Sequence, residues 1–289
     1  MDPNSVPWTT VHRRNLPLLA AVACALGLVA VALFGLVSDA GHARDVAMLH
    51  GFSALDQSRF NSAIRLLAQV PDPLPYAFIG LCCIGVALWR RRPWRALTVG
   101  VLLIATGLTT QVLKHLLAEP RFAAWMGPWG QIENASWPSG HSTAAMTLAL
   151  CAVLVAPPAV RAITALIGGA FAIGVGYATL ALAWHYPSDV VGGFFVAGLW
   201  VSLAIAVLQR VEPADAETAI APPWEPLAIL GGVGAVIGAI VVGSKAQAIA
   251  EYAQERTTVV AGAFAIAVLG LALVATVSAA TTRAGRPAR

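Results

Sequence analysis

Eight long apolar stretches, separated by short polar connections, constrain this 289-residue chain more than any other feature of its sequence. A transmembrane helix needs about 20 largely apolar residues. Each stretch therefore predicts a membrane-spanning helix, although the second and fourth stretches must borrow flanking residues to reach that length. The stretches are Leu16–Val37, Leu74–Trp89, Leu97–Leu117, Ser142–Val155, Val160–Trp184, Val190–Leu208, Pro226–Val242 and Thr258–Ala279.

The predicted fold is an all-α, polytopic integral membrane helix bundle. Hydrophobic residues make up 58% of the chain and charged residues only 11%, against about 25% charged in soluble domains, so a soluble globular protein is excluded. We expect a six-span core over residues 1–210, a cytoplasmic linker over 211–225, two additional transmembrane helices over 226–280 and a cytoplasmic tail over 281–289. The four cysteines lie inside apolar stretches without zinc or redox spacing, and we predict that they are small buried residues.

The distribution of positive charge predicts the orientation. If the amino terminus is cytoplasmic, 11 of the 18 Lys and Arg residues lie on the cytoplasmic side, as the positive-inside rule favours. The cluster Trp89–Arg95 is the strongest anchor, and both termini are then cytoplasmic. The net charge of +4 comes from such short clusters between apolar runs, which argues against binding to nucleic acid.

Two connections on the opposite, external side carry structural signals. Residues 42–73 have apolar side chains at helical spacing, which predicts a helix that lies on or caps the membrane. Residues 118–140 read as an interfacial loop, in which we expect Trp125, Trp129 and Trp137 to anchor in the headgroup region.

Polar residues at membrane depth are expensive to desolvate, and here they gather in three clusters: Lys114–Arg121, Pro138–His141 and His185–Asp189. Taken singly, each cluster has an ordinary interpretation: a snorkelling lysine, a helix cap at Ser139, a hydrogen-bonded His–Asp pair. However, the 44 positions between His141 and His185 suffice for a helix inward and a helix back. We therefore expect all three clusters to meet at one external face.

Together, the clusters have the chemistry of a phosphate site. A helix that begins in a Ser-Gly turn directs backbone N–H groups at an anion, and Lys114 and Arg121 would add positive charge beside the phosphoryl oxygens. A histidine held by a carboxylate can attack phosphorus, and a second histidine can protonate the departing oxygen.

These residues resemble the signature of the type 2 phosphatidic acid phosphatase family, which reads K-x6-R-P, P-S-G-H and S-R-x5-H-x3-D. Lys114 and Arg121 match the first motif, Pro138–His141 match the second, and His185 and Asp189 match the third. The resemblance implies catalysis without metal or organic cofactor. It also implies that His185 is the nucleophile that forms a phosphohistidine, Asp189 orients it and His141 is the general acid, while Lys114, Arg121, Ser139 and Gly140 bind the phosphate.

The chain departs from the family pattern at two places. Phe122 replaces the proline of the first motif, and Ala178-Thr179 replace the Ser-Arg pair of the third. The missing arginine removes a charged hydrogen bond worth about 1.5 to 3 kcal/mol. Thr179 can substitute with a neutral hydroxyl, or an external arginine can do so; the sequence does not choose among Arg44, Arg59, Arg65 and Arg256.

The leading hypothesis is therefore a multi-pass cell-membrane phosphatase, of a bacterial type, with its active site outside the cytoplasm. By analogy, polyprenyl diphosphates or polyprenyl-linked sugar phosphates are favoured as the lipid substrate. Two alternatives remain: a lipid phosphotransferase that uses the same site, and a degenerate member that binds or moves phospholipid without catalysis. The last two spans are candidates for contacts with a second copy or with a membrane partner.

Overall fold

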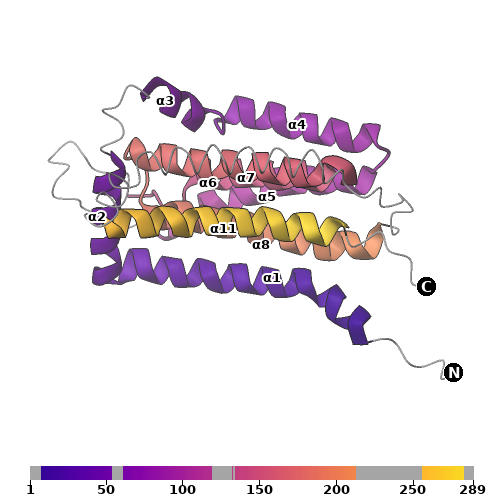
Figure 1. Cartoon of the computed structure of the whole chain (residues 1–289), viewed down its shortest axis with the longest axis horizontal. Helices are drawn as coiled ribbons and strands as arrows, with labels where there is room; N and C mark the ends of the chain where they lie inside the picture. The colour runs from indigo at the N-terminus through magenta and orange to yellow at the C-terminus, as the bar shows by residue number, and fades with distance from the viewer. Residues whose placement is uncertain (1–7, 54–60, 119–131, 133, 213–255, 283–289) are drawn as a thin grey trace, which may run out of the picture.

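The computed structural model describes residues 8–53, 61–118, 132, 134–212 and 256–282, and every element in these ranges is a helix. Most of the helices lie side by side in a bundle (Figure 1). In chain order they are α1 (Trp8–Ala32), the π-helical turn η1 (Leu33–Val37), α2 (Asp39–Ser53), α3 (Asn61–Gln69), α4 (Pro73–Trp89), α5 (Pro93–Leu116), α6 (Gly140–Val155), α7 (Pro158–Ala181), α8 (Pro187–Val211) and α11 (Thr257–Thr282).

The predicted membrane spans correspond closely to these helices. Five described segments are long and apolar enough to cross a membrane, and α3 with α4, which meet at a bend of 58°, make a sixth if they count as one span. The helix α6 is apolar but shorter, as its sequence predicts. The prediction of an all-α polytopic bundle is confirmed, while the predicted span Pro226–Val242 lies outside the described residues.

Large apolar side chains cover the outside of the bundle. Leu19 on α1, Phe78 on α4 and Ile104 on α5 are all more than 60% exposed. Apolar surface this extensive would be unstable in water, and it is the surface that a lipid bilayer covers. Cys82 on α4 is also exposed, so the prediction of four buried cysteines is wrong for this residue. It faces outward because α4 lies at the periphery of the bundle (Figure 1).

The short helix α6 lies at the centre of the bundle. Twelve of its 16 residues are buried, and it packs against α4, α5, α7, α8 and α11. At a rise of 1.5 Å per residue it is about 24 Å long, which is shorter than the hydrocarbon core of about 30 Å. Because protein surrounds α6, its polar ends can lie inside the bundle without facing lipid.

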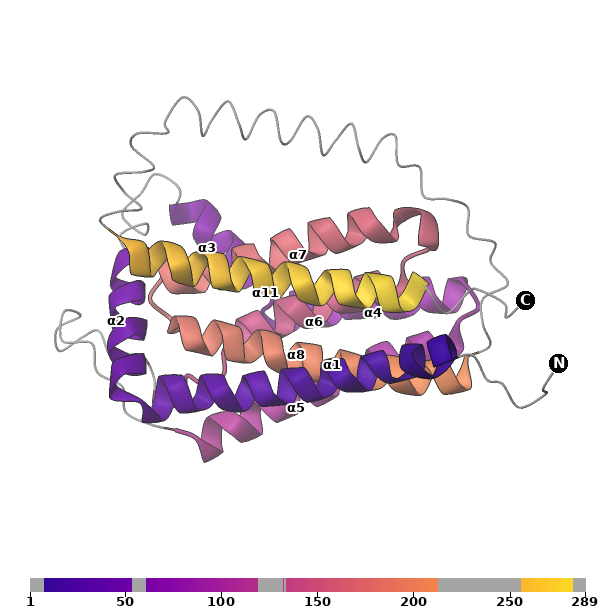
Figure 2. The same ribbon diagram turned by 60° about the horizontal axis from the view of Figure 1, so that its bottom comes forward.

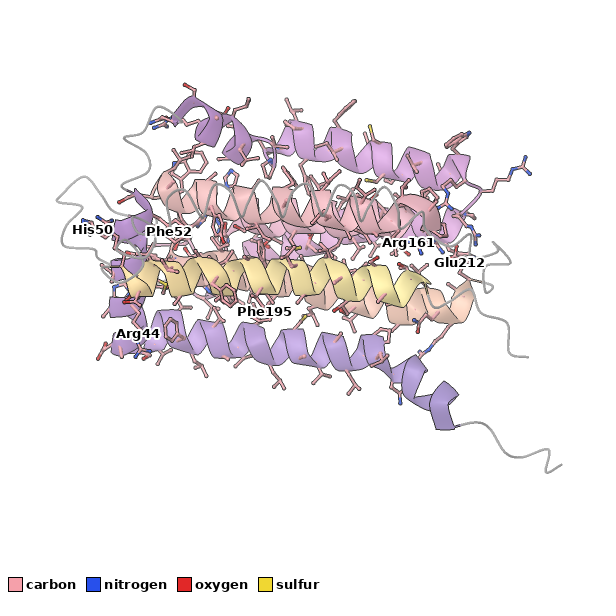
Figure 3. All side chains as sticks on the ribbon, in the orientation of Figure 1. Arg44, His50, Phe52, Arg161, Phe195 and Glu212 are labelled. Carbon is pink, nitrogen blue, oxygen red and sulfur yellow. The ribbon has the colours of Figure 1, made fainter. Side chains whose placement is uncertain are left out.

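The carboxyl end of α6 is capped by arginines. Arg95, Arg90 and Arg161 donate hydrogen bonds to the carbonyls of Leu154, Val155 and Ala156 at 3.2, 2.8 and 3.0 Å. These are carbonyls that a helix end leaves without intrahelical partners. Glu212 accepts from Arg95 Nε at 2.9 Å and so joins the end of α8 to this network. Arg161 and Glu212 mark this end of the bundle in Figure 3, opposite Arg44 and His50.

The helix α2 crosses the other end of the bundle at a steep angle to the long helices (Figure 2). It is the capping helix that the apolar spacing in residues 42–73 predicts. The helices α1 and α11 begin and end, respectively, away from α2 (Figure 1). The first and last described residues therefore lie near the arginine-capped end, and the assignment of that end to the cytoplasm stays a prediction.

The last described helix packs into the same hydrophobic core as the others. Ile266 and Val274 of α11 are buried against the bundle, and Tyr177 of α7 donates a hydrogen bond to the Ala263 carbonyl at 2.5 Å. The predicted linker and the seventh span fall largely within residues 213–255, which lie outside the described residues. The division of the chain at residue 211 therefore stays a prediction.

Candidate active site

The His185 cluster lies in the turn between α7 and α8. The helix α7 ends in a left-handed turn at Ala183, whose φ is 54°, with hydrogen bonds from Ala183 N to Leu180 O and from Trp184 N to Thr179 O. These two bonds form a Schellman motif. Pro187 then occupies the first turn of α8, where proline is well tolerated because no intrahelical donor is needed there.

Asp189 organises the start of α8. Its buried Oδ2 accepts hydrogen bonds from His185 Nδ1 at 3.3 Å and from the Tyr186 backbone N–H at 3.1 Å. The His185 side chain is 7% exposed and that of Asp189 is fully buried. The carboxylate thus fixes the imidazole ring with Nδ1 as the donor, which leaves Nε2 as the ring nitrogen with a lone pair.

The Pro138–His141 cluster forms the start of α6. Ser139 is the N-cap that the sequence predicts, and its Oγ accepts from Ser142 N at 3.2 Å. The Ser139 backbone N–H in turn donates to the Asp189 carbonyl at 2.9 Å. This bond joins the second and third polar clusters directly, across 50 positions of sequence.

A glycine of α8 makes this junction possible. A Cβ atom on Gly193 would lie 2.8 Å from the Ser139 carbonyl oxygen and 3.0 Å from Thr143 N, distances that real Cβ atoms rarely show. The two helix starts approach this closely because residue 193 has no side chain. Gly193 is not among the predicted site residues, and its only sequence signal is the Gly192-Gly193 pair, which begins three residues after Asp189.

The two histidines face each other across the junction. The ring centroids of His141 and His185 are 6.3 Å apart, and Trp184 lies 5.4 Å from the His141 ring. His141 Nε2 is 3.2 Å from Asp72 Oδ1, and the His141 side chain is 30% exposed. One imidazole is thus deeply buried and the other opens toward the surface, beside one helix start.

Of the remaining predicted site residues, only some lie near the two histidines. Lys114 is half-buried in the last turn of α5, close enough for its charge to act on His141. Arg121 lies outside the described residues, as does Arg59. Thr179 is fully buried and donates its hydroxyl proton to the Gly176 carbonyl at 2.8 Å, so it would have to break this bond to donate to a phosphate.

Three other arginines are candidates to replace the missing arginine of the third motif. Arg44 is exposed on α2 (Figure 3), Arg256 is exposed just before α11, and Arg65 donates from Nε to Asn61 Oδ1 at 2.6 Å on α3. The position that the family signature gives to arginine is therefore occupied by the short, buried side chain of Thr179.

Trp137 departs from its prediction. Its side chain is 2% exposed and lies against Gly192, where a Cβ atom would come within 3.0 Å of the indole. The expectation of an interfacial anchor is wrong for this residue, because the start of α6 folds inward onto α8 and carries Trp137 with it. Trp125 and Trp129 lie outside the described residues.

Two features bear on what this site can bind. The backbone N–H groups of Gly140 and His141, in the first turn of α6, donate to no acceptor within the described ranges. Such groups, with the positive end of the helix dipole, favour an anion. In the same ranges, no group of three or more His, Cys, Asp or Glu side chains is arranged to hold a metal ion.

Comparison with known families agrees with this arrangement. The model of the PAP2 superfamily matches residues 95–213, which contain nearly all of α5, the helices α6 to α8 and all three polar clusters. This part of the chain is therefore similar to the PAP2 superfamily. The crystal structure of a transmembrane PAP2-type phosphatidylglycerolphosphate phosphatase from Bacillus subtilis has a similar fold, with a TM-score of 0.53 at 22% sequence identity, over 66% of this chain and 97% of that one. No curated protein sequence matches the chain.

Two carboxylates near this site, Asp72 and Asp45, are not among the residues that the sequence motifs predict. Asp72 pairs with His141, as described above. Asp45 of α2 is fully buried, and its carboxylate accepts from the Ser188 backbone N–H at 3.1 Å and from the Ser188 hydroxyl. The capping helix therefore holds the residue that precedes Asp189. Neither carboxylate belongs to a motif, and both lie in a connection that contains several other charged residues, so no local signal distinguishes them.

Proposed function

We propose that the chain is a membrane phosphatase of the PAP2 superfamily that removes phosphate from a lipid through a phosphohistidine at His185. The observation that carries this proposal is the His185–Asp189 pair, 3.3 Å apart, facing His141 beside the open start of α6. A nucleophile, an acid and an anion-binding helix start are thereby within reach of one phosphorus atom.

In the first half-reaction, the Nε2 lone pair of His185 attacks phosphorus and the bond to the leaving oxygen breaks. The electron pair of that bond stays on the leaving oxygen, which takes a proton from the His141 imidazolium. Asp189 stabilises the positive charge that develops on His185, because its Oδ2 accepts the Nδ1–H hydrogen bond. The lipid alcohol, or a lipid phosphate from a diphosphate, leaves the site.

In the second half-reaction, water replaces the lipid. Neutral His141 takes a proton from the water as its oxygen attacks phosphorus, and the P–N bond breaks with its electron pair returning to His185 Nε2. Phosphate is released and both histidines regain their starting states. The backbone N–H groups of Gly140 and His141, the N-cap Ser139 and the ammonium group of Lys114 would hold the phosphoryl oxygens, with Arg121 as a further proposed ligand.

We further propose that the reaction occurs outside the cytoplasm. The arginine-rich end of the bundle is opposite the histidines, and basic clusters favour the cytoplasmic side. An outward site near the interface admits a headgroup while the lipid chain stays against the apolar helices. We favour polyprenyl diphosphates and polyprenyl-linked sugar phosphates as substrates. Phosphatidylglycerolphosphate, the lipid for which the B. subtilis phosphatase is named, is the first comparison.

The test is phosphate release from a panel of these lipids by the purified full chain, in detergent and with a chelator present. We expect release from at least one lipid, loss of turnover in His185→Ala and a severe reduction in His141→Ala. A His185→Ala variant as active as the parent would refute the nucleophile. Lipid binding with no phosphate release across the panel would favour the degenerate binding protein.

A transferase would be recognised in the same experiment. When candidate lipid or sugar alcohols are supplied as acceptors, a hydrolase gives free phosphate alone, whereas a transferase gives a phosphorylated acceptor. Phosphate transfer that exceeds hydrolysis would replace the proposed reaction with transfer from the same phosphohistidine.

A further inference from the structure

The bend between α3 and α4 brings an acidic residue against the proposed general acid. Asp72 immediately precedes α4, where the two helices meet at 58°, and its Oδ1 lies 3.2 Å from His141 Nε2. The two side chains are 45% and 30% exposed, so this pair lies at the mouth of the site, whereas the His185–Asp189 pair lies in its interior.

Three features of the site oppose protonation of His141, of which its burial is the largest. His185 faces it with ring centroids 6.3 Å apart, and the ammonium group of Lys114 acts on it from α5. Trp184 covers another part of the ring at 5.4 Å. A general acid must nevertheless carry a proton when the leaving group departs. The Asp72 carboxylate acts in the opposite direction to burial and to the Lys114 charge, because a nearby negative charge stabilises an imidazolium.

We propose that Asp72 is the positioning residue of the general acid, so that the site contains two His–carboxylate pairs with separate tasks. This inference rests on the proposed phosphatase activity. Asp72 accepts the hydrogen bond from Nε2–H, which orients the His141 ring and stabilises its charge. The Nδ1–H then remains to protonate the leaving oxygen as the P–O bond breaks, and His141 is left neutral with its Nε2–H still bonded to Asp72.

This assignment makes the importance of Asp72 depend on the leaving group. An alkoxide is a poor leaving group and needs a proton in the transition state, whereas p-nitrophenolate is stable as an anion and needs none. Loss of Asp72 should therefore slow cleavage of an alkyl phosphate far more than cleavage of p-nitrophenyl phosphate. A residue that merely holds the fold together would affect both esters equally.

The substitution Asp72→Asn separates charge from shape. Asparagine is as good an N-cap as aspartate, and the Asp72 side chain makes no capping hydrogen bond in α4, so the helix start should be kept. Asp72→Ala removes the acceptor as well as the charge. Asp39→Asn is the matched control, because Asp39 is an exposed carboxylate in the first turn of α2 at the same end of the bundle.

The experiment measures kcat/KM of the full chain in detergent for a short-chain alkyl phosphate lipid and for p-nitrophenyl phosphate. Because kcat/KM reports the steps up to formation of the phosphohistidine, hydrolysis of the intermediate does not mask the effect. For the alkyl ester we expect losses of about 10-fold in Asp72→Asn, about 100-fold in Asp72→Ala and more in His141→Ala. For the nitrophenyl ester we expect losses under about 3-fold, and Asp39→Asn should match the parent on both.

Parallel losses on the two esters, or no loss on the alkyl ester, would overturn the role of Asp72 and leave the proposed phosphatase intact. A parent chain that releases phosphate from neither ester would overturn both proposals. The thermal midpoint of each variant, measured alongside, identifies any loss that comes from unfolding.

Discussion

We predict that the close contact between Gly193 and Ser139 keeps the two histidines at their observed separation. In Gly193→Ala, the new methyl group would lie 2.8 Å from the Ser139 carbonyl oxygen, although ordinary contacts begin at 3.4 Å. Its other near neighbours include the backbone nitrogen of Thr143, so no side-chain rotation can relieve the contact fully. The starts of α6 and α8 must therefore separate by about 0.6 Å.

This separation should affect both stability and activity. Overpacking of a well-packed interior costs about 1 to 3 kcal/mol, and the hydrogen bond from Ser139 N to Asp189 O, now 2.9 Å, would lengthen. A misplacement of about 1 Å between reacting groups can reduce a rate on the order of 100-fold. For the smaller shift here we expect a reduction in kcat of about 10-fold.

The assay is phosphate release from the best lipid of the panel, combined with thermal unfolding in the same detergent. Gly107→Ala is the matched control, because the same methyl group on α5 would meet no atom within 4 Å and alanine favours a helix. We expect that control to keep the parental rate and at least the parental stability. A Gly193→Ala variant with parental kcat would refute the claim that the close contact between α6 and α8 positions the histidines.

Three further predictions concern the turn and helix starts around His185. Asp45→Asn leaves one side-chain oxygen for the two donors of Ser188. It should lower the free energy of unfolding by about 1 to 3 kcal/mol and should change kcat more than KM. Ser188→Ala keeps the carboxylate and should have the smaller effect on stability and on kcat, and the reverse order would contradict this reasoning. Ala183→Gly should raise the free energy of unfolding by about 1 kcal/mol, because φ is 54° at this residue. Ala181→Gly, inside α7, should lower the free energy of unfolding by a similar amount. If chemical denaturation shows that both substitutions change stability in the same direction, the left-handed turn is ruled out. Thr179→Arg should increase the rate of hydrolysis of a generic lipid phosphate and lower stability, since residue 179 is fully buried. Thr179→Val, which keeps the size of threonine, is the control. An unchanged rate in the arginine variant would indicate that phosphate binding is already complete without arginine at this position.

The local sequence pattern alone predicts most of the helices of this protein. Apolar runs define helices wherever lipid replaces water, because backbone polar groups must then be satisfied within the segment. The seven predicted spans that fall within described ranges correspond to helices. The direction of travel through those helices also places Lys114, His141 and His185 at one end, since each span reverses the chain. The N-cap at Ser139 follows from the preference of short polar side chains for helix starts.

Only the tertiary structure decided which groups touch. Asp72 reaches His141 across 69 positions and Asp45 reaches Ser188 across 143, and neither contact has a local signature, because each depends on a bend or on a helix lying across the bundle. The burial of Trp137 and the requirement for glycine at position 193 arise from the same close approach of α6 to α8. Composition and periodicity describe how a segment meets its solvent, whereas the partners of a buried carboxylate are set by packing between segments far apart in the chain.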